Sequence, residues 1–168
     1  MSAVVVNWPF KVVQGGAAAN PPTVKAKAVS LLAQREYSRQ ELSDKLKAED
    51  ASPEEVEQAL AQLAAKGLVD DTRVVETLVN RRAGKLGASR LRQELQAKGV
   101  SAELVAETMA DLKGTELARA QAVWQKKFGL LAASATDRNK QARFLASRGF
   151  SGDVVRKIVS GLADDAEQ

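Results

Sequence analysis

The chain has 168 residues and a formal net charge of +4, and 45% of its residues are hydrophobic but only 4% are aromatic. It contains no Cys and no His, which excludes a disulfide framework, a thiolate metal site and a histidine general base, and so argues against an enzyme. The apolar content is mainly Ala, Leu and Val, which suits helices packed on helices, and no run of about 18 to 20 apolar residues is present that could cross a bilayer.

Residues 1–22 end in GGAAANPP, a sequence that does not hold a helix. They predict a flexible N-terminal arm. The first residues, MSAVVVNWPFKVV, lack the basic segment of a signal peptide and are interrupted by Asn7 and Pro9. We therefore expect a cytoplasmic protein without a membrane partner.

A first unit of three helices is predicted over residues 23–69. Its first helix should run from 23 to about 35, because apolar residues there recur on one face. Ser38 and Glu41 have the spacing of a capping box, which starts the second helix, and Tyr37 stands in the position of a hydrophobic staple. A second Ser-to-Glu capping box and a closing glycine bound the third helix.

Two similar units follow at 70–113 and 114–163, before a short tail at 164–168 that we expect to fray. Asp70 or Asp71 starts the first helix of the second unit. An adjacent Asp pair could also suggest a metal-dependent nuclease. Such a site needs further converging carboxylates, so capping is the favoured interpretation.

A shared hydrophobic pattern indicates that the three units are repeats. Leu95 superimposes on Leu46 at an offset of 49 residues and on Leu145 at an offset of 50. The apolar positions that then coincide are Val105, Met109 and Leu112 in the second unit, Val56, Leu60 and Leu63 in the first, and Val155, Val159 and Leu162 in the third. Because each such unit buries its apolar face against its neighbours, the predicted fold is all-α, an elongated array of three tandem three-helix repeats with nine helices. In the third unit the middle helix is predicted over about 137–148.

Charge is distributed unevenly along the chain. Residues 36–71 hold ten acidic and four basic residues, a net charge of −6, whereas residues 72–148 hold seven acidic and fifteen basic residues, a net charge of +8. The first unit is thus acidic and the next two are basic. This segregation favours a partner that is polyanionic or carries both signs of charge, although a solvated surface with patchy charge is the alternative.

Several short segments have the character of family motifs: LLAQREYSRQEL, LVDD, NRRAGKLGASRLRQEL, KGVS and LASRGFSGDVV. The most specific among them are REYSR-x-EL and L-x-x-RGFS. Together they resemble the RecX regulatory proteins, bacterial modulators of the RecA recombinase, over residues 25–162. The resemblance implies tandem three-helix repeats that lie along the groove of the RecA filament on single-stranded DNA. It also implies opposition to filament growth, ATP hydrolysis and strand exchange, and in some members direct DNA binding.

Candidate partner-binding or DNA-binding residues are the exposed cations of the motifs and of the basic units. They are Arg35, Arg39, Arg81, Arg82, Lys85, Arg90, Arg92, Lys126, Lys127, Arg143 and Arg148. Their charges would meet phosphates or an acidic filament surface, and the alternative for each is a solvated helix end.

Other residues in the same segments have a structural and a functional interpretation. Tyr37 is expected to pack as a staple, and Trp124 and Phe128, four residues apart, are expected in a core rather than stacked on bases. Gly84 and Gly87 would allow a partner close to the backbone, or they would end one helix and begin the next. The sequence leaves both options open.

The predicted function is that of a non-enzymatic regulator that binds RecA filaments and single-stranded DNA, and double-stranded DNA as a further partner. No glycine-rich phosphate loop is present, so nucleotide hydrolysis would belong to the partner. We expect no cofactor and, without Cys or His ligands, no metal. The alternative is a helix-turn-helix-like protein that places residues 81–92 on duplex DNA. No self-associating segment is evident to match a palindromic operator, so a monomer is expected.

Overall fold

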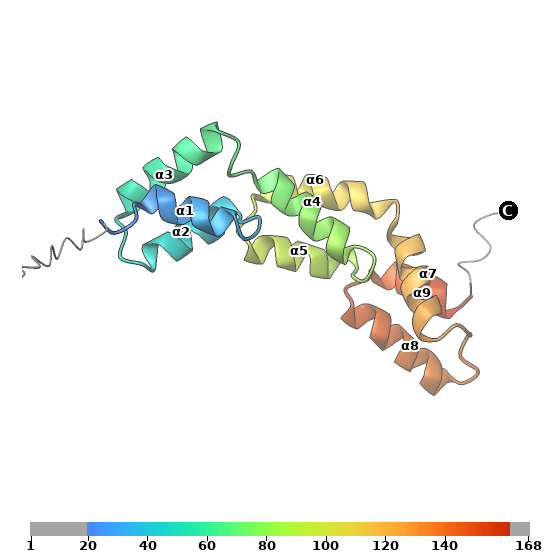
Figure 1. Ribbon diagram of the computed structural model, residues 1–168. Helices are drawn as coiled ribbons and strands as arrows, with labels where there is room; N and C mark the ends of the chain where they lie inside the picture. Colours follow the sequence, from blue (N-terminus) through green and yellow to red (C-terminus); the bar gives the residue numbers. More distant parts are fainter. Residues whose placement is uncertain (1–19, 162–168) are drawn as a thin grey trace, which may run out of the picture.

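The computed structural model describes residues 20–161. Most of the predicted N-terminal arm, and the predicted tail with Leu162, lie outside the described residues. Within 20–161 the chain forms nine α-helices and no strand (Figure 1), which are α1 (Val24–Leu32), α2 (Arg39–Lys47), α3 (Pro53–Ala65), α4 (Asp71–Arg82), α5 (Ala88–Ala97), α6 (Ala102–Lys113), α7 (Glu116–Lys127), α8 (Ala135–Ser147) and α9 (Gly152–Val159). The predicted all-α fold class is confirmed.

The helices group into three successive triplets, and Figure 1 shows them as an elongated row. We call α1–α3 repeat 1, α4–α6 repeat 2 and α7–α9 repeat 3. Within repeat 1 both α1 and α2 pack on α3, and within repeat 3 both α7 and α8 pack on α9. None of the helices in the described part of the chain is both long enough and apolar enough to cross a membrane.

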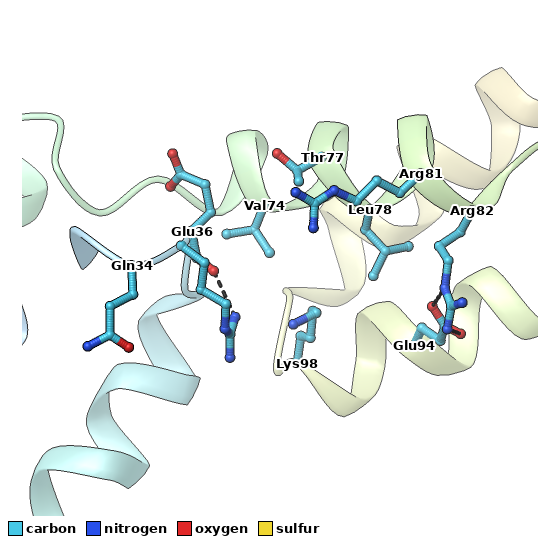
Figure 2. A pocket seen from close by; sticks show the side chains of 10 residues that line it. Gln34, Glu36, Val74, Thr77, Leu78, Arg81, Arg82, Glu94 and Lys98 are labelled. Atoms are coloured by element: carbon cyan, nitrogen blue, oxygen red, sulfur yellow. Dashed lines mark hydrogen bonds and ion pairs between the residues drawn. The ribbon is translucent and has the colours of Figure 1, made fainter. Parts of the chain in front are cut away.

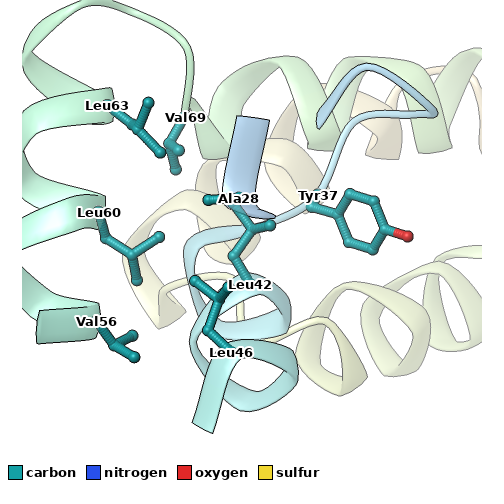
Figure 3. Close-up of a cluster of buried hydrophobic side chains, with 8 residues drawn as sticks. All are labelled: Ala28, Tyr37, Leu42, Leu46, Val56, Leu60, Leu63 and Val69. Carbon is teal, nitrogen blue, oxygen red and sulfur yellow. The ribbon is translucent and has the colours of Figure 1, made fainter. Parts of the chain in front are cut away.

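Each repeat has a hydrophobic core of its own. The core of repeat 1, drawn in Figure 3, is built from Ala28, Tyr37, Leu42, Leu46, Val56, Leu60, Leu63 and Val69. In repeats 2 and 3 the positions predicted from the periodicity are again buried or half-buried, and Leu95 and Leu145 are fully enclosed. In α9 the most deeply buried side chain is Ile158, which the repeat pattern did not mark, beside the half-buried Val159.

The predicted helix starts carry the predicted caps. The Ser38 side chain accepts the Glu41 backbone N–H at 3.1 Å, and the Glu41 carboxylate accepts the Ser38 N–H at 3.0 Å. Tyr37 and Leu42, on either side of this box, are buried in the same core, as a hydrophobic staple requires. Asp70 caps α4 by accepting the Thr72 N–H at 2.9 Å.

Two helix boundaries differ from the predicted ones. α1 ends at Leu32 rather than near Arg35, and the residues after it turn to bring Tyr37 into the core. α8 begins at Ala135, two residues before Asp137, because Ser134 is its N-cap and accepts the Asp137 backbone N–H at 3.0 Å. Asp137 is therefore a first-turn acid whose carboxylate accepts the Ser134 hydroxyl at 2.8 Å, not the cap itself.

Candidate functional site: two clefts at the repeat junctions

Successive repeats are joined by a hydrogen bond to an equivalent backbone carbonyl. In each junction the start of one repeat's middle helix meets the end of the next repeat's middle helix. The Ser38 hydroxyl before α2 donates to the carbonyl of Lys98 after α5, and the Gly87 N–H before α5 donates to the carbonyl of Arg148 after α8 at 2.9 Å. The repeats therefore form one continuous array in which the two junctions are built from equivalent positions.

An acidic residue at the start of the next repeat strengthens each junction. The Asp71 carboxylate accepts the Arg39 N–H at 2.9 Å, and the Glu116 carboxylate accepts the Ala88 N–H at 3.3 Å, so each acid caps the middle helix of the preceding repeat. Glu116, only 7% exposed, also accepts the Ser151 N–H and hydroxyl at 3.3 and 3.0 Å. Both carboxylates lie at the positive end of a helix dipole. Asp71 is thus a structural carboxylate across a repeat junction.

Glycines allow the junctions to close. Gly99 and Gly149 have φ values of +69° and +85°, and each faces the middle helix of the preceding repeat. A Cβ at Gly149 would lie 2.6 Å from the Arg90 backbone nitrogen, and one at Gly99 would collide with Gln40. The equivalent residue in repeat 1 is Asp50, which also has a positive φ, of 62°. No described repeat precedes Asp50, so a side chain can be accommodated there.

A cleft opens beside each junction. The junction 1 cleft, between repeats 1 and 2, has a volume of about 440 Å³ and is drawn in Figure 2. Its lining residues are Gln34, Arg35, Glu36, Val74, Thr77, Leu78, Arg81, Arg82, Glu94 and Lys98. Val74 and Leu78 form an apolar wall, and the charged residues of both signs stand around it (Figure 2).

The junction 2 cleft, between repeats 2 and 3, has about 470 Å³ and a different character. It is lined by Gly84, Lys85, Ala122, Val123, Lys126, Lys127, Phe144 and Arg148. Its lining combines apolar side chains with four cations and includes no carboxylate. The Phe144 ring packs edge-to-face on Phe128, with centroids 5.3 Å apart, and the Arg148 guanidinium lies 5.1 Å from the centre of the Phe144 ring.

Most cations of the junction 1 cleft are held by carboxylates. Arg82 forms a two-point ion pair with Glu94, with nitrogen–oxygen distances of 2.8 and 3.1 Å, and these bonds raise the pKa of Arg82. Lys98 and Arg35 both bind Glu41, at 2.9 and 3.2 Å.

The shared carboxylate of Glu41 is held in its charged form. Burial alone would raise the pKa of Glu41, but the hydrogen bonds from the Ser38 N–H, Lys98 and Arg35 outweigh it, and the pKa is lowered. The pKa of Arg35 is raised, because its bond with Glu41 outweighs the opposite effect of burial.

Comparison with known protein families decides what kind of chain this is. Three family models match it in order: "RecX, first three-helix domain" at residues 25–63, "RecX, second three-helix domain" at 70–109 and "RecX, third three-helix domain" at 115–159. The chain belongs to the RecX family. The three matches coincide with the three helix triplets.

Individual relatives agree with this assignment. The chain is 43% identical over 149 residues to the regulatory protein RecX of Leptothrix cholodnii, covering 88% of this chain and 94% of that protein. It is 42% identical over 141 residues to the regulatory protein RecX of Ralstonia pickettii, covering 84% and 89%. The crystal structure of RecX from Lactobacillus salivarius has the same fold, with a TM-score of 0.68 at 19% identity over 83% of this chain and 94% of that one.

The structure brings some of the predicted RecX site residues together. Lys85, from the second repeat, stands at the same cleft as Lys126, Lys127 and Arg148 from the third. Arg35, Arg81 and Arg82 line the junction 1 cleft. The predicted site is thus divided between two clefts.

Other predicted residues lie elsewhere or are already engaged. Arg39 pairs with Glu57 and Arg35 stacks on Tyr37, with 3.6 Å between its guanidinium and the ring centre. The Arg90 side chain lies against Gly149 and donates to Gln93. Arg92 and Arg143 are exposed and line neither cleft.

The structure also shows what surrounds the glycines and the aromatic residue Trp124 that had both a structural and a functional interpretation. Gly87 is in close contact with the Gly149 and Phe150 backbone, so its small size serves the repeat junction, whereas Gly84 has open space around it. Trp124 is buried and its ring N–H donates to Gln141 at 2.9 Å, which confirms the core interpretation.

Sequence reasoning missed Lys98, a cation of the junction 1 cleft. It occupies a helix-end position equivalent to that of Arg148, and that equivalence was the available signal.

Proposed function

We propose that this RecX-family chain regulates the RecA recombinase by binding the RecA filament on single-stranded DNA. In this proposal it inhibits filament growth, ATP hydrolysis and strand exchange and so modulates DNA repair and recombination. The observation that carries the proposal is the recurrence of one cleft at two successive junctions of an elongated array. A partner that itself repeats, such as a filament, can meet both clefts at once, so that weak contacts act as one multivalent contact.

The proposed contact residues are the cations of the two clefts together with the other predicted ones, Arg39, Arg90, Arg92 and Arg143. The chain would act as a monomer in the cytoplasm and without catalysis. ATP hydrolysis would belong to RecA, and this chain would change its rate by acting on the filament.

The alternative, a helix-turn-helix-like protein on duplex DNA, is less well supported. Such proteins read base edges with the first residues of a helix placed in the major groove. In this chain the starts of α2 and α5 are occupied by the next repeat, since Arg39 N–H binds Asp71 and the Gly87 and Ser89 N–H groups bind the Arg148 and Gly149 carbonyls. Two of the three middle helices therefore have no free first turn.

The proposal is tested by charge reversal in the clefts. Arg82 is a poor choice because Glu94 holds it, so we select Arg81→Glu, Lys85→Glu and Lys126→Glu in one variant. The matched control is Lys66→Glu, Lys113→Glu and Lys140→Glu, which makes the same charge change at exposed sites outside both clefts.

We expect the cleft variant to need at least about ten times more protein than the control to inhibit DNA-dependent ATP hydrolysis by RecA, a loss equivalent to about 1.4 kcal/mol of binding. Circular dichroism should show the same helical content in both. Equal inhibition by the two variants would remove the clefts from the contact surface.

A further inference from the structure

The two clefts are built from equivalent positions of successive repeats. Arg81 and Arg82 end α4 as Lys126 and Lys127 end α7, and Lys98 follows α5 as Arg148 follows α8. Three cation positions are therefore common to both junctions.

Among the other differences between the two linings, two replace a carboxylate of the junction 1 cleft. Where the junction 1 cleft has Glu36 and Glu94, the junction 2 cleft has Lys85 and Phe144. Glu94 neutralises Arg82 at 2.8 Å, whereas no carboxylate of the described residues pairs with Lys85, Lys126 or Lys127. In the junction 1 cleft Glu94 thus neutralises Arg82, and Glu36 adds a second carboxylate, which pairs with Arg73 at 3.3 Å outside the lining. The junction 2 cleft keeps its cations available to an outside anion.

We propose that the junction 2 cleft binds one strand of nucleic acid, with phosphates on Lys85, Lys126 and Lys127 and a base against Phe144, and that Glu36 and Glu94 prevent such binding at junction 1. This inference rests on the proposed function, because it assigns the DNA strand of the filament to one of the two clefts.

The chemistry of the junction 2 cleft favours a nucleic acid strand over an acidic protein. Each nucleotide carries a charged phosphate and a flat base, and the cleft lining offers ammonium groups together with the apolar side chains of Ala122, Val123 and Phe144. Its volume of about 470 Å³ lies within the usual range for small-molecule pockets, which is large enough for one nucleotide. An acidic peptide would satisfy the lysines but leave the apolar side chains without an equivalent partner.

The test measures binding of a fluorescein-labelled 20-nucleotide oligo(dT) to the whole chain, without RecA, by anisotropy at several NaCl concentrations. The loss variant is Lys126→Gln with Lys127→Gln, and its control is Lys113→Gln with Lys140→Gln, all at exposed positions. Because each phosphate contact on a single strand contributes about 0.7 to the salt slope, the loss variant should reduce the slope by about 1.4. The control should change it by less than half as much.

Exchange of residues between the clefts gives a sharper result. Glu36→Lys with Glu94→Phe places the junction 2 residues at these two positions of junction 1, and we expect tighter binding with a steeper salt dependence. Phe144→Leu keeps an apolar side chain in the core of repeat 3 but removes the ring, and it should weaken binding several-fold at an unchanged salt slope.

Several outcomes would overturn the inference. They are equal losses in the lysine pair and its control, no gain from the exchange variant, or a preference for duplex over single-stranded DNA. If oligo(dT) binding fails these tests while the chain still inhibits RecA, only the cleft assignment falls. If oligo(dT) binding behaves as expected but RecA is unaffected, the cleft assignment stands and the proposed function falls.

Discussion

At the scale of single residues, Gly67 and Gly99 have the same φ of +69°, yet only Gly99 touches another helix. Gly67 has nothing within 4 Å of the place a Cβ would occupy, whereas a Cβ at Gly99 would collide with the Gln40 side chain on α2. The two glycines therefore separate the cost of backbone strain from the cost of opening a repeat junction.

Gly67→Ala should cost roughly 1 to 2 kcal/mol, because alanine is strained in the left-handed region. Gly99→Ala carries the same strain and must also displace α2, so its cost should be larger by at least about 1 kcal/mol. Urea unfolding followed by circular dichroism measures both. Equal costs would mean that the junction yields to a methyl group without resistance.

The buried carboxylate of Glu116 makes a second residue-scale prediction. Glu116→Ala leaves the Ala88 and Ser151 N–H groups without their acceptor, so the free energy of unfolding should fall by about 2 to 3 kcal/mol. Glu76→Ala, an exposed change in α4, is the control and should stay within about 0.5 kcal/mol. Chemical denaturation measures both changes in the free energy of unfolding. Similar changes for the two variants would mean that Glu116 does not stabilise the contact between the repeats.

At the scale of helices, Glu41 and Glu55 hold the same position in two capping boxes but differ in their surroundings. Both carboxylates accept an N-cap N–H, but only Glu41 also binds Lys98 of the next repeat. The lowered pKa of Glu41 means that its contribution to stability is present above its ordinary value of 4.5 and is lost as the pH falls below it.

Glu41→Gln should therefore cost about 1 to 2 kcal/mol at pH 7, where the charged bonds are lost, and less at pH 3, because the contribution of Glu41 is lost as the pH falls from 4.5 through its lowered pKa. Glu55→Gln breaks no bond to the next repeat, so its cost at pH 7 should be smaller. Thermal unfolding of the three proteins at both pH values provides the comparison. A parallel pH dependence in the two variants would contradict the role given to the α2–α5 contact.

Local patterns in the sequence predicted most of the helices and little of the site. The Ser38–Glu41 box and the repeated leucines mark helix starts and buried faces, because capping and amphipathicity act within a few residues. Lys85 and Lys126 line the same cleft only because Gly87 contacts Gly149 across the repeat junction. That contact joins residues far apart in the sequence, so no local pattern predicts it.

Unequal spacing of the repeats also hid the equivalence of Arg81 and Arg82 with Lys126 and Lys127. α4 and α7 are offset by 45 residues, from Asp71 to Glu116, rather than by the 50 that aligned Leu95 with Leu145. The difference arises because the loop between α7 and α8, and α8 itself, are both longer than their counterparts in repeat 2.

At the scale of the whole molecule, three separate cores predict local rather than global loss of structure. Leu145 is fully enclosed in the core of repeat 3, and Leu145→Ala should cost about 2 to 5 kcal/mol. Because each repeat of an array depends on its own core and its neighbours, amide hydrogen exchange should rise most in α7–α9 and least in α1–α3. A uniform rise across all three repeats would indicate a single cooperative unit.

The elongated array with a cleft at each junction leads to the central claim, that this RecX-family chain restrains RecA filaments. The most direct measurement is ATP hydrolysis by the cognate RecA on single-stranded DNA, with this protein titrated from far below to equal stoichiometry. We predict a loss of turnover at substoichiometric amounts, which simple withholding of DNA does not reproduce. Unchanged hydrolysis at equal stoichiometry would contradict the claim and direct attention to sequence-specific binding of duplex DNA.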